Sequence, residues 1–182
     1  MKAGTVIRSF TAKDRRKVIL RTPKWEDLDD LLELINSLVD ERADIFRAEK
    51  ASRVEEIDWL SRVLASLEKD EVFFLVAEVD GKVIASSDLR PQRGYEKHVG
   101  VIGIVIKNGF RDTGIGTEIM RTLVEHGRKI GLKVLTLSAF GTNKRAIHVY
   151  EKVGFVETGR IPKKHFRDGQ YIDEVIMTKL LE

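Results

Sequence analysis

The stretch "FRDTGIGTEI", residues 110–119, joins a strand-like segment to a segment with helical periodicity. Before it, "HVGVIGIVI" at 98–106 is typical of a buried strand, and after it "IMRTLVEHGRKI" at 119–130 repeats apolar residues at helical spacing. The start of such a helix presents free backbone N–H groups and a partial positive charge. Gly114 and Gly116 carry no Cβ, so an anion can approach the backbone. The stretch is therefore either an anion-binding loop or a plain strand-to-helix turn.

The composition narrows the class of protein. The 182 residues are 42% hydrophobic and 34% charged, which indicates one globular domain over residues 1–182. No cysteine is present, which excludes disulfides, thiolate catalysis and zinc–sulfur sites. The net charge of +3 is too small to indicate a nucleic-acid partner, and no nucleic-acid motif accompanies it. Asn and Gln together number only five beside abundant Lys, Arg and Glu, a bias resembling that of heat-adapted proteins.

The sequence shows neither a signal-peptide pattern nor a membrane-span pattern. The first 20 residues contain no apolar run of signal-peptide length, and no stretch approaches the length of a membrane span. We therefore expect a cytoplasmic protein without a membrane partner.

The order of elements predicts a mixed α/β domain. Two short strands at 6–10 and 17–21 precede a helix that Thr22 is expected to cap and a second helix that Ser52 and Glu55 begin with capping-box spacing. Three strands follow between residues 73 and 106. A helix from 115 and the buried strand "KVLTLSA" at 133–139 come next. A short helix that Thr142 or Asn143 is expected to cap ends at Gly154, and a terminal strand pair completes the chain.

Two familiar phosphate loops do not fit the opening stretch. A P-loop requires Lys and then Ser or Thr after its last glycine, and a dinucleotide fingerprint requires a third glycine where the chain has Ile119. "RDTGIG" at 111–116 instead matches R/Q-x-x-G-x-G, and "NKRAIHVYEKVGF" at 143–155 matches N-x-x-A-x-x-x-Y-x-x-x-G-F. With one helix and one strand between them, these segments resemble the GCN5-related N-acetyltransferase (GNAT) superfamily over about residues 17–182.

The resemblance implies a fold and a cofactor. The GNAT fold is a central, mostly antiparallel sheet of about seven strands flanked by about four helices, splayed between the fourth and fifth core strands. Residues 1–16 would add an N-terminal strand to a core at 17–182. The implied acyl donor is acetyl-CoA, whose pantetheine arm pairs with the strand before the loop and whose pyrophosphate rests on the loop.

The residues that the resemblance assigns to the cofactor lie in three segments. They are Ile104, Val105, Ile106, Arg111, Asp112, Thr113, Gly114, Ile115, Gly116, Thr117, Asn143, Arg145, Tyr150 and Lys152. Each also has an ordinary structural interpretation: a buried strand for 104–106, a helix cap for Asn143, and solvated helix charges for Lys144, Arg145 and Lys152. No pair of histidines has metal-ligand spacing, so no metal site is expected.

The implied chemistry is direct attack of a neutral amine on the thioester in a ternary complex. Tyr150 occupies the family's general-acid position, although its ring also suits simple packing on the helix. The resemblance does not assign a general base, because Ser138 and Gly100 occupy the positions where some family members have a glutamate. His98 is a candidate by strand alternation and by its usual pKa range, and a water chain through backbone carbonyls is the default.

The acceptor implied is a primary amine of a small molecule or of a protein. Carboxylates in the expected acceptor region suit a cationic amine, or else form a charge-rich surface: Glu41, Asp44, Glu49, Glu55, Glu56, Asp168, Asp173 and Glu174. A catalytically inactive CoA-binding sensor or scaffold is the alternative function. The terminal strands could pair between two copies of the chain, so a homodimer is a possible assembly.

Overall fold

The eight strands form a single sheet in the order β1-β2-β3-β4-β5-β6-β8-β7. The computed structural model describes residues 1–181. Its strands are β1 (Val6–Thr11), β2 (Lys17–Arg21), β3 (Phe73–Val79), β4 (Lys82–Pro91), β5 (Val99–Ile106), β6 (Val134–Phe140), β7 (Val156–Arg167) and β8 (Gln170–Leu180). All neighbours are antiparallel except β5 and β6. The sheet therefore contains the seven expected core strands plus β1, which pairs with β2 at one edge.

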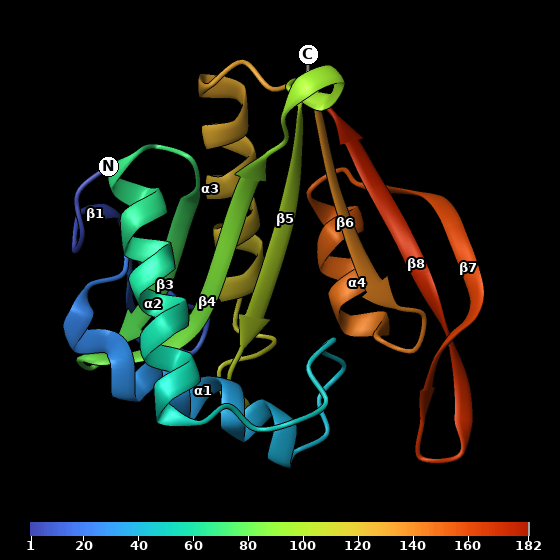
Figure 1. Ribbon diagram of the computed structural model, residues 1–182, viewed down its shortest axis with the longest axis horizontal. Coiled ribbons are helices and arrows are strands. Elements are labelled where there is room, and N and C mark those ends of the chain that lie inside the picture. Colours follow the sequence, from blue (N-terminus) through green and yellow to red (C-terminus); the bar gives the residue numbers. More distant parts are fainter. Residues whose placement is uncertain (182) are drawn as a thin grey trace.

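Four α-helices cover the two faces of the sheet. They are α1 (Leu28–Asp40), α2 (Arg53–Glu68), α3 (Ile115–Lys129) and α4 (Lys144–Lys152). In Figure 1, α1 and α2 lie in front of the sheet, and α3 and α4 lie behind it. This arrangement confirms the expected mixed α/β GNAT architecture. Among residues 1–181, none of the helices has both the length and the apolar character that crossing a bilayer requires.

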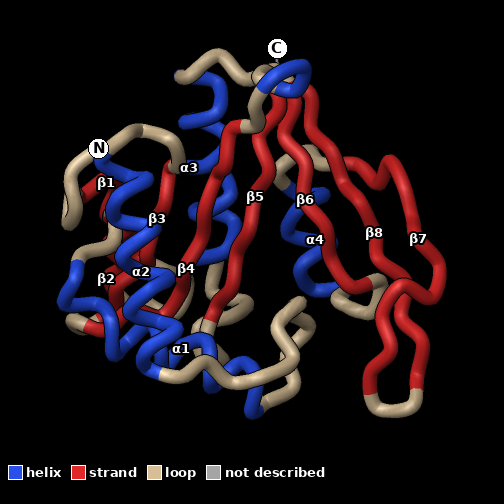
Figure 2. Tube along the Cα trace, in the orientation of Figure 1, coloured by secondary structure: helices blue, strands red, loops and turns tan. Residues whose placement is uncertain are grey.

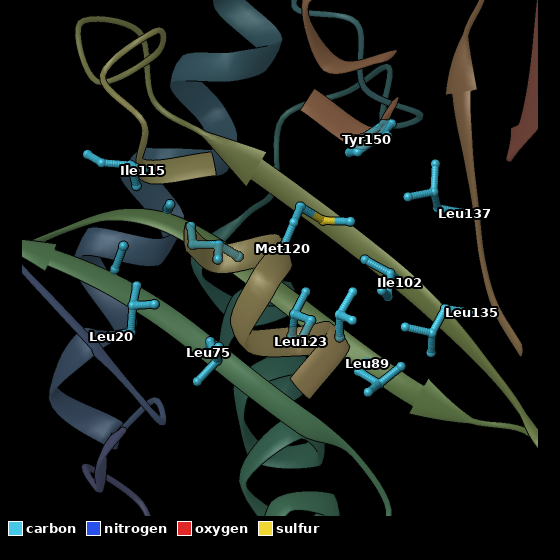
Figure 3. Close-up of a cluster of buried hydrophobic side chains, with 14 of the residues drawn as sticks. Leu20, Leu75, Leu89, Ile102, Ile115, Met120, Leu123, Leu135, Leu137 and Tyr150 are labelled. Carbon is cyan, nitrogen blue, oxygen red and sulfur yellow. The ribbon is translucent and has the colours of Figure 1, made fainter. Parts of the chain in front are cut away.

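The main core lies between the sheet and α3. The buried residues of α3 repeat at helical spacing, and they pack on alternate residues of β3, β4 and β5. Figure 3 shows Met120 and Leu123 of α3 among Leu75, Leu89 and Ile102. A second cluster joins α1 and α2 to the opposite face of β3 and β4. Both faces of the central strands are therefore fixed by packing.

The sheet is splayed between β5 and β6, as the resemblance to the GNAT superfamily implies. These strands pair in parallel only between residues 99–101 and 134–136 and then diverge, which Figure 2 shows. Gly100 sits in this short seam because a Cβ there would lie 2.6 Å from Leu89 Cδ1 and 2.7 Å from Leu132 Cδ1. Beyond the seam, no strand among residues 1–181 lies beside one edge of β5. That edge adjoins the start of α3.

The entry into α1 differs from the expectation. Thr22 does not cap a helix: its Oγ1 accepts the Thr5 N–H at 2.8 Å, and a 3-10 turn at 25–27 precedes α1. The cause is Arg21, whose buried guanidinium donates two 2.7 Å hydrogen bonds to Asp27. Asp27 also accepts the Lys24 N–H at 2.9 Å and so organises the turn. The buried Arg21–Asp27 pair, which Glu78 of β3 also contacts through Arg21, therefore sets where α1 begins, and Thr22 does not.

Candidate active site

The loop between β5 and α3 has the geometry of an anion site. Gly114 is the residue before the first turn of α3 and has φ of +89°, in the left-handed region that glycine adopts without strain. The N–H groups of the first helical turn have no intrahelical acceptors and point away from the helix beside the open edge of β5. Asp112 also has a positive φ, of +62°. The loop thus exposes backbone donors at a helix N-terminus.

Gly116 has a packing role in addition to any role in binding. A Cβ at this position would lie 3.1 Å from Ile106 Cδ1 and 3.9 Å from Val149 Cγ1. The absence of a side chain therefore lets α3 approach both β5 and α4. The two glycines of the opening stretch serve different purposes, one a backbone conformation and the other close contact between elements.

Charged side chains fix the loop to its neighbours. Arg111 donates from Nε to the Ile106 carbonyl at 2.9 Å and forms an ion pair with Glu41 at the end of α1. Asp112 pairs with Arg145 of α4 at 3.3 Å. The structure thus brings Arg111, Asp112 and Arg145 together at the loop, where they are paired with protein groups.

The N-terminal hairpin contributes a residue that sequence reasoning missed. The Lys13 N–H donates to the Thr113 carbonyl at 2.9 Å, and its methylenes lie over Gly114. Lys13 and Lys152 also line a cavity of about 160 Å³ beside the loop. The charged turn "TAKDRR" at 11–16 was visible in the sequence, but nothing local indicates that it meets residues 100 positions later.

Tyr150 projects from α4 into the main core. Its side chain is among the buried residues, and burial raises the pKa of its phenol to about 12. The hydroxyl therefore stays protonated across the working pH range of a protein and remains a hydrogen-bond donor. Asn143 accepts the Ala146 N–H at 3.2 Å and caps α4, which accords with its structural interpretation.

His98 lies apart from this group. It is exposed, it precedes β5, and its carbonyl accepts the N–H groups of Lys133 and Val134 at the closed end of the splay. The loop at 110–116 follows the opposite end of β5. The structure therefore does not bring His98 together with Tyr150 and the glycine loop.

Most carboxylates of the expected acceptor region are already paired. Glu41 pairs with Arg111, Asp44 with Arg167, Asp168 with Arg42, Asp173 with Arg160, and Glu174 with Lys164 and His165. The pairs Asp44–Arg167 and Arg42–Asp168 hold the segment between α1 and α2 against the β7–β8 hairpin, and the pairs of Asp173 and Glu174 lie within that hairpin. They favour the interpretation of this region as a charge-rich structural surface.

A larger cavity opens on the other face of the sheet. It has a volume of about 770 Å³ and lies between α1, α2 and the strands β3, β4 and β5. Gly103, Ile104 and Val105 form its floor at β5, so it reaches the strand that adjoins the splay. Glu55 and Glu56 line it together with arginines from α2 and β4. The cavity therefore carries charges of both signs.

Residues 1–181 contain no cluster of three or more side chains suited to hold a metal ion.

Comparison with known proteins identifies the family. The model of the Acetyltransferase (GNAT) family matches residues 31–155. The L-amino acid N-acetyltransferase AaaT of Escherichia coli is 31% identical over 108 residues, which are 58% of this chain and 67% of that protein. A probable N-acetyltransferase, camello, of Xenopus tropicalis is 28% identical over 105 residues, and the match spans only 48% of its length.

Solved structures agree on the fold. A phosphinothricin acetyltransferase from Sinorhizobium meliloti, solved in complex with acetyl-CoA, superposes with a TM-score of 0.79 at 20% identity. The match covers 94% of this chain and 89% of that one. Together with the family match over residues 31–155, this places the chain in the Acetyltransferase (GNAT) family, a family of acyltransferase enzymes.

Proposed function

We propose that this protein transfers an acetyl group from acetyl-CoA to the primary amine of a small molecule. The observation that carries the proposal is the open edge of β5, which ends at a helix N-terminus with Gly114 in the left-handed region. An elongated donor can pair with that edge through backbone hydrogen bonds while its phosphates meet the N–H groups of α3.

The cofactor contacts follow from this placement. Ile104–Ile106 offer backbone groups to the pantetheine arm, and residues 112–117 surround the pyrophosphate. Lys13 and Lys152 add positive charge beside the loop, while Lys144 and Arg145 lie on α4, the neighbouring helix. The ion pairs of Arg111 with Glu41 and of Asp112 with Arg145 hold the loop in shape before the donor binds, which lowers the entropy cost of binding.

The acceptor is proposed to be an amine that also carries a carboxylate. The cavity of about 770 Å³ opens onto β5 from the side opposite the main core, and it contains both acidic and arginine side chains. Such a lining matches a zwitterion, and the relative AaaT is named as an L-amino acid N-acetyltransferase. The size of the cavity suits a free amino acid or a short peptide end.

In the proposed reaction the amine nitrogen attacks the thioester carbonyl, and the CoA thiolate leaves. Tyr150 donates a hydrogen bond toward the departing sulfur, as its position on α4 in the GNAT pattern implies. With a pKa of about 12, the phenol is a weak proton donor to a thiolate, whose usual pKa is near 8.5. Its contribution is therefore a positioned hydrogen bond, with the proton arriving from the attacking nitrogen.

The experiment is a panel of free amino acids, polyamines and peptides incubated with acetyl-CoA, with CoA release as the readout. CoA alone is expected to raise the melting temperature by linkage. Acetylation of one or more free amino acids supports the proposal. A melting shift with no acetylation across the panel would favour the sensor or scaffold alternative, and no shift with CoA would reject both.

A further inference from the structure

Asp88 of β4 lies on the face of the sheet that α1 and α2 cover, and it lines the large cavity. Its partner across the β4–β5 ladder is Gly103. A Cβ at Gly103 would lie only 2.8 Å from Asp88 Oδ1, so the carboxylate occupies the space of the missing side chain. Asp88 therefore reaches over β5 from the neighbouring strand.

The carboxylate is poorly satisfied within residues 1–181. Its side chain is 18% exposed, and Oδ2 accepts no hydrogen bond there. Arg90 Nε lies 2.7 Å from Oδ2, but its N–H is not directed at that oxygen, so the contact is an ion pair without a good hydrogen bond. Burial raises the pKa of Asp88 to about 6, and the charge of Arg90 opposes part of that rise.

In the proposed binding mode of the donor, the course of β5 brings the reacting atoms toward Asp88. The glycine loop follows Ile106, so a pantetheine arm that leaves the loop passes residues 106, 105 and 104 in turn. Its acyl end then lies beside Gly103. Neighbouring strands are about 4.8 Å apart, and the Asp88 carboxylate spans that spacing to lie over Gly103, so it faces across β5 toward an amine at that acyl end.

We propose that Asp88 is the catalytic base, with its carboxylate accepting the proton of the acceptor ammonium in the cavity beside Gly103. The proposal rests on the proposed acetyl transfer. It also accounts for the lack of a glutamate on β5 itself, since the carboxylate comes from the adjacent strand and Gly103 makes room for it.

The ammonium gives one proton to Asp88, which later releases it to solvent. The free amine forms the C–N bond as the carbonyl takes negative charge, and the C–S bond then breaks. The second nitrogen proton passes to the leaving sulfur, giving the amide and CoA thiol.

Other charged groups share the cavity and define its electrostatics. Glu55, Glu56, Asp58 and Arg62 face it from α2, and Arg47 from the segment before α2. Glu71, Arg90 and Arg93 complete the lining near the ends of β3 and β4. Burial also raises the pKa of Glu56, but Glu56 is on α2 and not across from Gly103.

The test compares Asp88→Asn with Asp30→Asn. Asp30 is a matched control because its side chain is 17% exposed and accepts the Val83 N–H of the same strand, but it does not line the cavity. With acetyl-CoA and the best amino acid of the panel, Asp88→Asn is expected to lower kcat/KM about 100-fold or more. It should also remove the rise of activity near pH 6, while the CoA melting shift stays intact. Asp30→Asn should keep the rate and the pH profile of the wild type.

Each outcome decides something. If Asp88→Asn keeps the wild-type rate and pH profile, Asp88 is not the base, while acetyl transfer itself stands. If the wild type acetylates nothing, the proposed function fails and the base assignment with it. Should Asp88→Asn not fold, Asp88→Ser removes the same carboxylate with a smaller side chain, and its rate and pH profile are judged by the same criteria.

Discussion

The buried carboxylate of Asp88 is expected to cost stability at neutral pH, and Asp88→Asn should return that stability. The pKa of Asp88 is about 6 in the folded protein, against an ordinary value of 3.8. Because the folded-state pKa is raised, the protonated form is favoured by folding. The stability from this group is fully present below about pH 4 and is lost as the pH rises through 6. The folded-state and ordinary pKa values differ by about two units, which corresponds to about 3 kcal/mol of unfolding free energy lost at pH 8.

The assay is urea unfolding of the wild type and of Asp88→Asn at several values from pH 4 to pH 8. The difference in unfolding free energy should be small at pH 4 and grow to 1–3 kcal/mol, roughly, in favour of Asn at pH 8. The upper value of this range assumes that the Asn amide is as stable in the folded site as the protonated Asp88 carboxyl. Asp30→Asn should not stabilise the protein at pH 8, because it removes the ion pair between Asp30 and Lys82. A difference independent of pH, or one that favours Asp at pH 8, would refute the reasoning.

Two further predictions concern the Tyr150 hydroxyl and the first helix. Tyr150→Phe removes the proposed hydrogen bond to the leaving sulfur and should lower turnover about 100-fold, while the CoA melting shift stays nearly unchanged because the ring still fills the core; an unchanged turnover would exclude a role for the hydroxyl. Asp27→Ala should lower the unfolding free energy by about 3 kcal/mol, since it leaves the buried Arg21 with Glu78 as its one remaining carboxylate. Asp29 forms an exposed ion pair with Arg53 and offers the control. Asp29→Ala should lower the unfolding free energy by less than about 1 kcal/mol in the same urea experiment.

The sequence predicts those parts of the fold that depend on local patterns. The capping box of Ser52 and Glu55, the short helix capped by Asn143 and the glycine loop are all present where expected. These features depend on the spacing of residues that lie close together in the chain, which can be read from one sequence. The splay and the mostly antiparallel sheet were expected only through the resemblance to a family.

Long-range contacts are the part that could not be predicted. Thr22 was expected to cap α1, but Arg21 and Asp27 bring in Glu78 from β3, and the helix begins later. Asp88 had no motif around it, and its place opposite Gly103 depends on the β4–β5 register. Lys13 reaches the loop only because β1 and β2 form a hairpin at the sheet edge.

The short seam at residues 99–101 and 134–136 also divides the molecule mechanically. On one side lies a five-stranded block held by α1, α2 and α3, and on the other lies a three-stranded block of β6, β8 and β7, against which α4 rests. Backbone pairing between the blocks is confined to the end far from the glycine loop. In the proposed binding mode, a donor contacts both blocks at their open end and holds them together there. The protection of the β6–β8 amides against hydrogen exchange should therefore report donor occupancy.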